Sequence, residues 1–80
     1  MSRERLKEWV PEALQALGGK AKVIDVAKQI WKMHSKDLSI ADDLFFTWQY
    51  DMRWAALTLR DKGVLEEVDE LPRGVWALKV

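Results

Sequence analysis

Residues 47–80 read TWQYDMRWAALTLRDKGVLEEVDELPRGVWALKV, and the hydrophobic period of this stretch changes partway along it. From residue 47 to about residue 62 the apolar residues recur at helical spacing, which predicts a helix capped by Thr47 and ended by Gly63. These residues form two apolar faces, with Trp48, Met52, Ala55 and Leu59 on one and Tyr50, Trp54 and Leu57 on the other. We therefore expect this helix to be enclosed on two sides.

Beyond Gly63 the apolar residues alternate with polar ones. Residues 64–68 and 74–80 are rich in Val, Leu and Trp, which favour a pleated, half-buried surface. The residues between them, 69–73, contain Pro72 and predict a turn. The end of the chain is therefore predicted to be a β-hairpin.

Two further helices are predicted before this unit. The apolar stripe of the first consists of Leu6, Trp9, Val10, Ala13, Leu14 and Leu17, and the pair Gly18-Gly19 ends it. The stripe of the second consists of Val23, Val26, Ala27, Ile30, Trp31 and His34. Residues 20–23 predict a short extended piece before the second helix. The periodicity breaks over residues 35–46, which predict a single short helical turn.

Three helices followed by a β-hairpin predict an α+β fold, a winged helix-turn-helix formed by a single domain over residues 1–80. In that fold the third helix is presented to DNA and the hairpin is the wing. The predicted core consists of Leu6, Trp9, Val10, Leu14, Leu17, Val26, Ile30, Trp31, Met52, Ala55, Leu59, Leu65, Trp76 and Leu78.

A resemblance to a known family points to the same fold. The runs Trp54-Ala55, Leu59-Arg60, Gly63-Val64-Leu65 and Arg73-Gly74-Val75-Trp76 follow one another at the spacing of that family. With them, nearly the whole chain resembles the N-terminal domain of the Mrr restriction-endonuclease family. The resemblance implies a winged helix that directs a PD-(D/E)XK nuclease domain to DNA, often to modified DNA. A chain of 80 residues has no room for the nuclease, which another domain or protein would supply.

The composition limits the chemistry that the chain can perform. It has no Cys and a single His, so neither a thiolate nor a His-rich metal site is expected. We find no nucleophile–base pair and no glycine-rich phosphate loop, and we expect neither enzymatic activity nor a cofactor. No apolar run approaches ~18 residues and the N-terminus lacks a signal-peptide pattern, which predicts a cytoplasmic protein with no membrane partner.

The charges balance overall but are distributed unevenly. There are 13 basic and 13 acidic residues, so the strongly basic footprint of many nucleic-acid-binding domains is absent. Residues 1–36 hold eight basic and four acidic residues, whereas residues 37–80 hold five basic and nine acidic residues. Any basic binding surface is therefore local.

The best recognition candidates lie on the predicted third helix. Gln49, Arg53 and Arg60 share the narrow stripe left between its two apolar faces. Arg reads guanine and Gln reads adenine through paired hydrogen bonds in the major groove. These residues are predicted to contact bases, or alternatively to form an ordinary solvated helix face.

Basic residues elsewhere are candidates for phosphate contacts. Lys28, Lys32 and Lys36 recur every four residues along one face of the second helix, and Lys22 precedes it. Arg73 is the basic residue of the predicted wing. Such contacts would position the protein on DNA without specifying sequence. The alternative interpretation is an exposed, solvated helix face.

The aromatic residues and the histidine are interpreted as structural. The five tryptophans are predicted to pack in the core, the alternative being an aromatic pocket for a methylated base, and Trp48, at the first turn of the third helix, is the expected exception to core packing. His34 ends the apolar stripe of the second helix without a nucleophile near it in sequence. It is therefore predicted to be a packed structural histidine.

Two functions remain open from the sequence. One is a DNA-binding module of a restriction-type or regulatory system, whose partners are double-stranded DNA, modified or unmodified, and a nuclease domain. The other is a protein-interaction module that docks a protein partner through the acidic wing or the basic helix. The resemblance and the Gln49/Arg53/Arg60 stripe favour the first. Asp51 and the acidic wing residues favour the second, the latter being Glu66, Glu67, Asp69 and Glu70.

Overall fold

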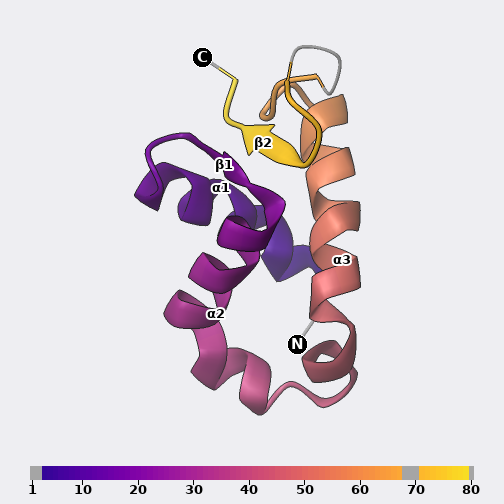
Figure 1. The fold of residues 1–80 in the computed structure, drawn as a ribbon. Helices are drawn as coiled ribbons and strands as arrows, with labels where there is room; N and C mark the ends of the chain where they lie inside the picture. The colour runs from indigo at the N-terminus through magenta and orange to yellow at the C-terminus, as the bar shows by residue number, and fades with distance from the viewer. Residues whose placement is uncertain (1–2, 68–70, 80) are drawn as a thin grey trace.

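The computed structural model describes residues 3–67 and 71–79, and within them three α-helices pack against a small antiparallel sheet (Figure 1). In chain order the elements are the 3₁₀ helix η1 (Arg3–Arg5), α1 (Leu6–Ala16), β1 (Lys20–Lys22), α2 (Val23–Ser39), α3 (Asp42–Asp61) and β2 (Val75–Ala77). The predicted α+β class is confirmed. In Figure 1 the sheet lies at one end of the molecule, beside the start of α2 and the end of α3.

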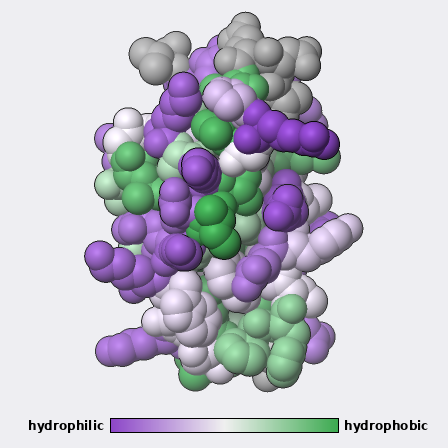
Figure 2. Space-filling model, viewed as in Figure 1, coloured by the Kyte–Doolittle hydropathy of each residue, from purple (hydrophilic) through white to green (hydrophobic). Residues whose placement is uncertain are grey.

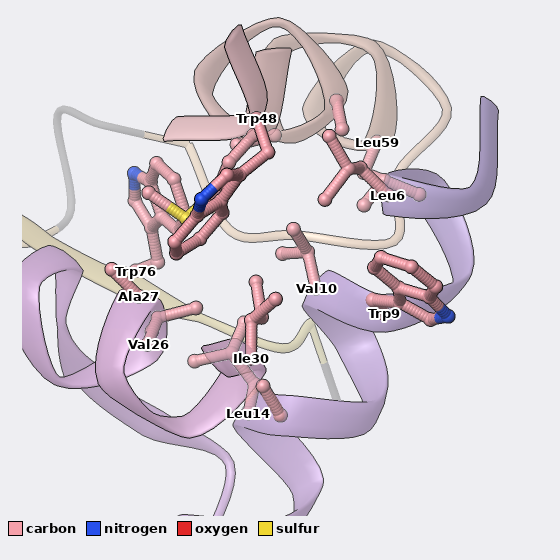
Figure 3. Close-up of a cluster of buried hydrophobic side chains, with 14 of the residues drawn as sticks. Leu6, Trp9, Val10, Leu14, Val26, Ala27, Ile30, Trp48, Leu59 and Trp76 are labelled. Atoms are coloured by element: carbon pink, nitrogen blue, oxygen red, sulfur yellow. The ribbon is translucent and has the colours of Figure 1, made fainter. Parts of the chain in front are cut away.

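One apolar cluster joins the three helices. Leu6, Val10 and Leu14 of α1 are fully buried, and their side chains converge with those of Val26 and Ile30 from α2 (Figure 3). From α3 the cluster takes Trp48, Met52, Ala55, Ala56 and Leu59, and from the C-terminal segment Leu65 and Trp76. Most of the predicted core is therefore buried. The predicted core residues Leu17 and Leu78 are only half-buried at its edge.

The sheet pairs segments that lie far apart in the chain. Lys20–Lys22 pairs with Val75–Ala77 in antiparallel register, with Ala21 opposite Trp76. The predicted hairpin over 64–68 and 74–80 is wrong in this respect. Leu65 makes only an isolated bridge to Leu78, and residue 68 lies outside the described residues.

Two backbone hydrogen bonds explain why that hairpin is short. The Glu66 N–H donates to the Ala77 carbonyl and the Lys79 N–H donates to the Val64 carbonyl, which completes one bridge. β1 pairs with the opposite edge of β2, and the Leu78 N–H donates to the Gly19 carbonyl. β2 is thus paired mainly with the segment between the first two helices.

This pairing also anchors the start of α2. The N-cap, Lys22, makes no side-chain capping bond, but the Val23 N–H donates to the Gly74 carbonyl at 2.9 Å. One of the free N–H groups of the helix terminus is therefore satisfied by the chain preceding β2. The position of α2 is in this way coupled to the C-terminal segment.

The helices α2 and α3 are both longer than predicted. Instead of one short turn over 35–46, α2 continues to Ser39 through a kink at His34, where φ is −130° and ψ is 18°. The third helix begins at Asp42 and not at Thr47. The cause is Leu44, which lies one turn before Trp48 on the same buried stripe. Thr47 is accordingly inside the helix, where its hydroxyl donates to Asp51 at 2.7 Å.

Two predictions about the aromatic residues are wrong. Trp48 is buried and Trp31, which was placed in the core, is 41% exposed. The second apolar face of α3 is also largely open, since Tyr50 is 75% and Leu57 is 53% exposed. Only Trp54 on that face is half-covered, by the Arg3 guanidinium 4.0 Å from its ring centroid. α3 is therefore enclosed on one side and partly shielded on another.

Candidate functional site

A basic groove lies where β1 meets α2. Four lysines line it, namely Lys20, Lys22, Lys28 and Lys32, together with Leu17, Ala21, Asp25, Gln29 and Val75. Its volume is about 580 Å³. The lysines are all exposed, because they lie on the solvent side of β1 and on the face of α2 that turns away from the core. Asp25 is the acidic residue among the lining side chains.

A second hollow, the aromatic pocket, continues from this groove toward α3. Its volume is about 470 Å³ and it is lined by Ile24, Ala27, Lys28, Trp31, Phe45, Trp48 and Gln49. Lys28 belongs to both hollows, so the groove and the pocket are neighbours. The pocket exists because α2 and α3 diverge where the Trp31 and Phe45 side chains project, each about two-fifths exposed.

A third, smaller hollow extends the surface along α3. It holds about 350 Å³ and is bordered by Ile24, Gln49, Tyr50 and Arg53, with Val23, Ala27 and Met52 at its base. Gln49 lies at the edge of both this hollow and the aromatic pocket. We call the continuous surface from Lys20 to Arg53 across these three hollows the α2–α3 face. In Figure 2 hydrophobic and near-neutral side chains run between these helices, with hydrophilic side chains on both sides.

The cations of the α2–α3 face form no ion pair among the described residues. The Lys/Arg ion pairs within 3–67 and 71–79 are Arg5–Glu8 and Lys7–Glu4, both at the start of α1. No such pair involves the basic residues of the face, which are Lys20, Lys22, Lys28, Lys32 and Arg53. Asp51, predicted to oppose DNA, is half-buried and accepts the Thr47 hydroxyl.

The structure brings together five of the eight predicted site residues. Gln49 and Arg53 are exposed next to each other on α3, and Lys28 reaches the same pocket from α2. Lys22 and Lys32 line the neighbouring basic groove, to which Lys28 also belongs. The predicted base-reading stripe and the predicted phosphate-binding lysines therefore share one surface.

Arg60 does not belong to that surface. It is half-buried, and its Nε atom is buried without a hydrogen-bond partner among the described residues. Ala56, one turn earlier on the same stripe, packs in the core with Leu65 and Trp76. The C-terminal segment therefore covers the end of the stripe, which a helical wheel of α3 alone does not reveal.

The other two predicted residues lie outside the three hollows. Lys36 is exposed but follows the kink at His34, which breaks the four-residue repeat that begins with Lys28 and Lys32. Arg73 is exposed in the turn just before β2. Of the residues that favoured a protein-binding wing, Glu66 and Glu67 are described, whereas Asp69 and Glu70 lie outside the described residues.

The sequence interpretation missed Ile24 and Phe45 as parts of this surface. Ile24 is 59% exposed and borders both the aromatic pocket and the third hollow. The exposure of Ile24 could have been predicted, because this residue lies off the apolar stripe by which α2 packs in the core. No comparable signal marked Phe45, since the residues around it were not assigned to a helix.

His34 has a structural environment, as predicted. Its ring stacks on Trp9 with centroids 4.1 Å apart and planes 9° from parallel. Its Nε2 atom lies 2.5 Å from a Glu12 carboxylate oxygen, so the side chain joins α1 to α2. Within 3–67 and 71–79, no three His, Cys, Asp or Glu side chains gather in a way that could hold a metal ion.

Comparison with known proteins gives no assignment. No family model, no curated protein and no solved structure matches the chain. Among the helices of the described part of the chain, none has the length and hydropathy needed to cross a bilayer.

Proposed function

We propose that this protein is a DNA-binding module of the winged-helix type, with the α2–α3 face as its DNA-binding surface. The single observation that carries the proposal is the set of exposed, unpaired cations on that face. Four lysines repel each other around one groove, where Asp25 is the one carboxylate among the described lining residues. A polyanion placed on the face would relieve this repulsion and release its own condensed counterions.

The arrangement of the elements is compatible with this proposal. A strand between the first two helices pairs with the C-terminal strand, which in turn bridges to Leu65 just after the third helix. The bridge and the turn before β2 would form a short wing. The resemblance of the chain to the N-terminal domain of the Mrr family supports the same assignment. It implies a targeting role, with any nuclease supplied by another domain or protein.

In the proposed complex α3 enters the major groove with its exposed Gln49 and Arg53 toward the base edges. A bidentate Arg–guanine or Gln–adenine contact contributes ~1–3 kcal/mol of discrimination between bases. Lys22, Lys28 and Lys32 contact the phosphates beside the groove, and Arg73 extends these contacts from the wing. The role is binding without catalysis.

The proposal is tested by mapping amide chemical shifts during a titration with a short random-sequence duplex. We expect the shifts to concentrate on residues 20–32 and 49–53, whereas the exposed side of α1 stays unchanged. Because phosphate contacts supply most of nonspecific affinity, raising the salt concentration should reverse the shifts. Shifts spread evenly over the chain, or absent at low salt, would contradict a DNA-binding α2–α3 face.

A second candidate function rests on a different observation. Phe46, Tyr50 and Leu57 follow one another along the exposed side of α3 and are 83%, 75% and 53% exposed. Exposed apolar stripes of this kind mark protein-binding surfaces. The candidate is a protein-interaction module. It predicts that Phe46→Ala, at a residue outside the three hollows, abolishes partner binding while Lys32→Ala does not. DNA binding predicts that Lys32→Ala weakens binding while Phe46→Ala does not.

A further inference from the structure

The geometry points to a binding site for a single unstacked nucleobase in the aromatic pocket between α2 and α3. This inference rests on the proposed function and extends it. The ligand is a base that has left its stack, held by a strand whose phosphates lie in the neighbouring basic groove.

Aromatic side chains form the walls. The rings of Trp31 and Trp48 are 17° from parallel, with centroids 6.1 Å apart, and Phe45 closes the side that belongs to α3. Trp48 is 7% exposed and holds the floor, whereas Trp31 is 41% exposed and offers a free ring surface. Every base has a π-face that stacks on such a ring, and one stacked base contributes ~1–3 kcal/mol.

The polar edge is suited to the rim of a base. Gln49 is exposed at the mouth of the pocket, and its amide carries both a donor and an acceptor. Among the side chains that the structure describes, those lining the pocket include the Lys28 cation and no carboxylate, which suits the sugar-phosphate chain of the same nucleotide. A purely hydrophobic partner would leave the Gln49 amide without a role.

Lys28 connects the pocket to the phosphates. It lines both the aromatic pocket and the basic groove, where Lys22 and Lys32 add two further unpaired cations. A strand that follows the lysines therefore passes the mouth of the pocket. The pocket volume of about 470 Å³ leaves room for one base with its sugar at the opening. This charge complementarity favours a nucleotide over a peptide side chain.

The test compares the affinity of the full chain for three DNAs of one sequence: a fully paired duplex, the same duplex with one mismatch, and the single strand. A mismatched base leaves the stack at a lower cost. The wild-type chain should therefore bind the mismatched duplex at least about fivefold more tightly than the paired one, the ratio that ~1 kcal/mol of stacking gives. Preferred binding of the single strand by the same factor would identify unpaired strands as the source of the base.

Four variants separate the pocket from the rest of the surface. Trp31→Ala should remove the mismatch preference, because it lowers affinity for the mismatched duplex more than affinity for the paired one, and Trp31→Phe should restore most of the preference. Gln49→Ala should reduce it without disturbing the fold, because the side chain is exposed. Leu57→Ala, an equally simple truncation on the open side of α3, should leave it unchanged.

The outcomes keep the two proposals apart. If the chain binds paired duplex but shows no preference for unpaired bases, or if Trp31→Ala and Gln49→Ala both keep the preference, the base-binding pocket is refuted and DNA binding stands. If none of the three DNAs binds at low salt, the proposed function fails and the pocket fails with it. Cross-linking of iodouracil placed at the mismatch should label Trp31, and labelling confined to other residues would also refute the pocket.

Discussion

The indole rings of Trp31 and Trp48 lie nearly parallel, yet one belongs to the surface and the other to the core. Their centroids are 6.1 Å apart and their planes differ by 17°. Trp48 is 7% exposed and packs in the apolar cluster, while Trp31 is 41% exposed at the edge of the α2 stripe. The pair therefore forms the boundary between the fold and the proposed binding surface.

That boundary predicts unequal stability effects. Trp48→Ala opens a cavity in the core and should lower the free energy of unfolding by ~3–5 kcal/mol. Trp31→Ala loses mainly its contact with the other ring and should cost ~1–2 kcal/mol. Chemical denaturation monitored by far-UV circular dichroism measures both. Equal losses for the two variants would show that Trp31 is as important to the core as Trp48.

His34 is predicted to hold the kinked part of α2 against α1. His34→Ala removes the stack on Trp9 and the contact with Glu12, which together should contribute about 1–3 kcal/mol. His34→Phe keeps an aromatic ring on Trp9 and should lose only part of that amount. The comparison uses urea denaturation of both variants. If His34→Phe is no more stable than His34→Ala, the ring stack contributes nothing.

The basic groove is predicted to act through charge alone. Lys32→Ala should weaken binding to every duplex by a similar factor and reduce the slope of log affinity against log salt by about one unit. Lys36→Ala is the matched control, because it removes a lysine four residues later that lies beyond the kink and outside the groove. Fluorescence anisotropy over a salt series measures the slope. A larger effect from Lys36→Ala would place the phosphate path elsewhere.

Sequence preference is predicted to depend on Arg53 and not on Arg60. Arg53→Ala should cost ~1–3 kcal/mol on a preferred site selected from a random library and much less on random DNA. Arg60→Ala should leave the preference unchanged, since that side chain is half-buried with a buried Nε atom and lies outside the three hollows. Competition binding with the selected and random duplexes measures the ratio. Loss of preference in Arg60→Ala alone would contradict this assignment.

The helical stripes explain which parts of the fold could be predicted. The stripes of α1 and α2 predicted the burial of Leu6, Val10 and Ile30, because a period of 3.6 residues needs no tertiary information. The start of α3 was missed although Leu44 continues the stripe of Trp48. The sequence predicted the Asp42-Asp43 pair as the N-terminal charges of a separate short helix, whereas α3 begins at Asp42.

Tertiary pairing set the limits of the prediction. Lys20–Lys22 is too short to show a strand pattern, and only its partner Val75–Ala77 makes it a strand. Arg60 is half-buried, whereas Gln49 and Arg53 of the same predicted stripe are exposed, because the stripe reaches the core at Ala56, in one cluster with Leu65 and Trp76. The position of the aromatic pocket was not predicted, because residues of two helices line it and the sequence does not show how these helices pack against each other.

The salt dependence of binding to a random-sequence duplex tests whether the α2–α3 face binds DNA. If Lys22, Lys28, Lys32 and Arg73 each contact a phosphate and release its counterions, log affinity should fall with log salt with a slope of roughly −3 to −4. The account predicts measurable binding at low salt that weakens along this line. Absence of binding at low salt, or an affinity that does not change with salt, would contradict a DNA-binding α2–α3 face.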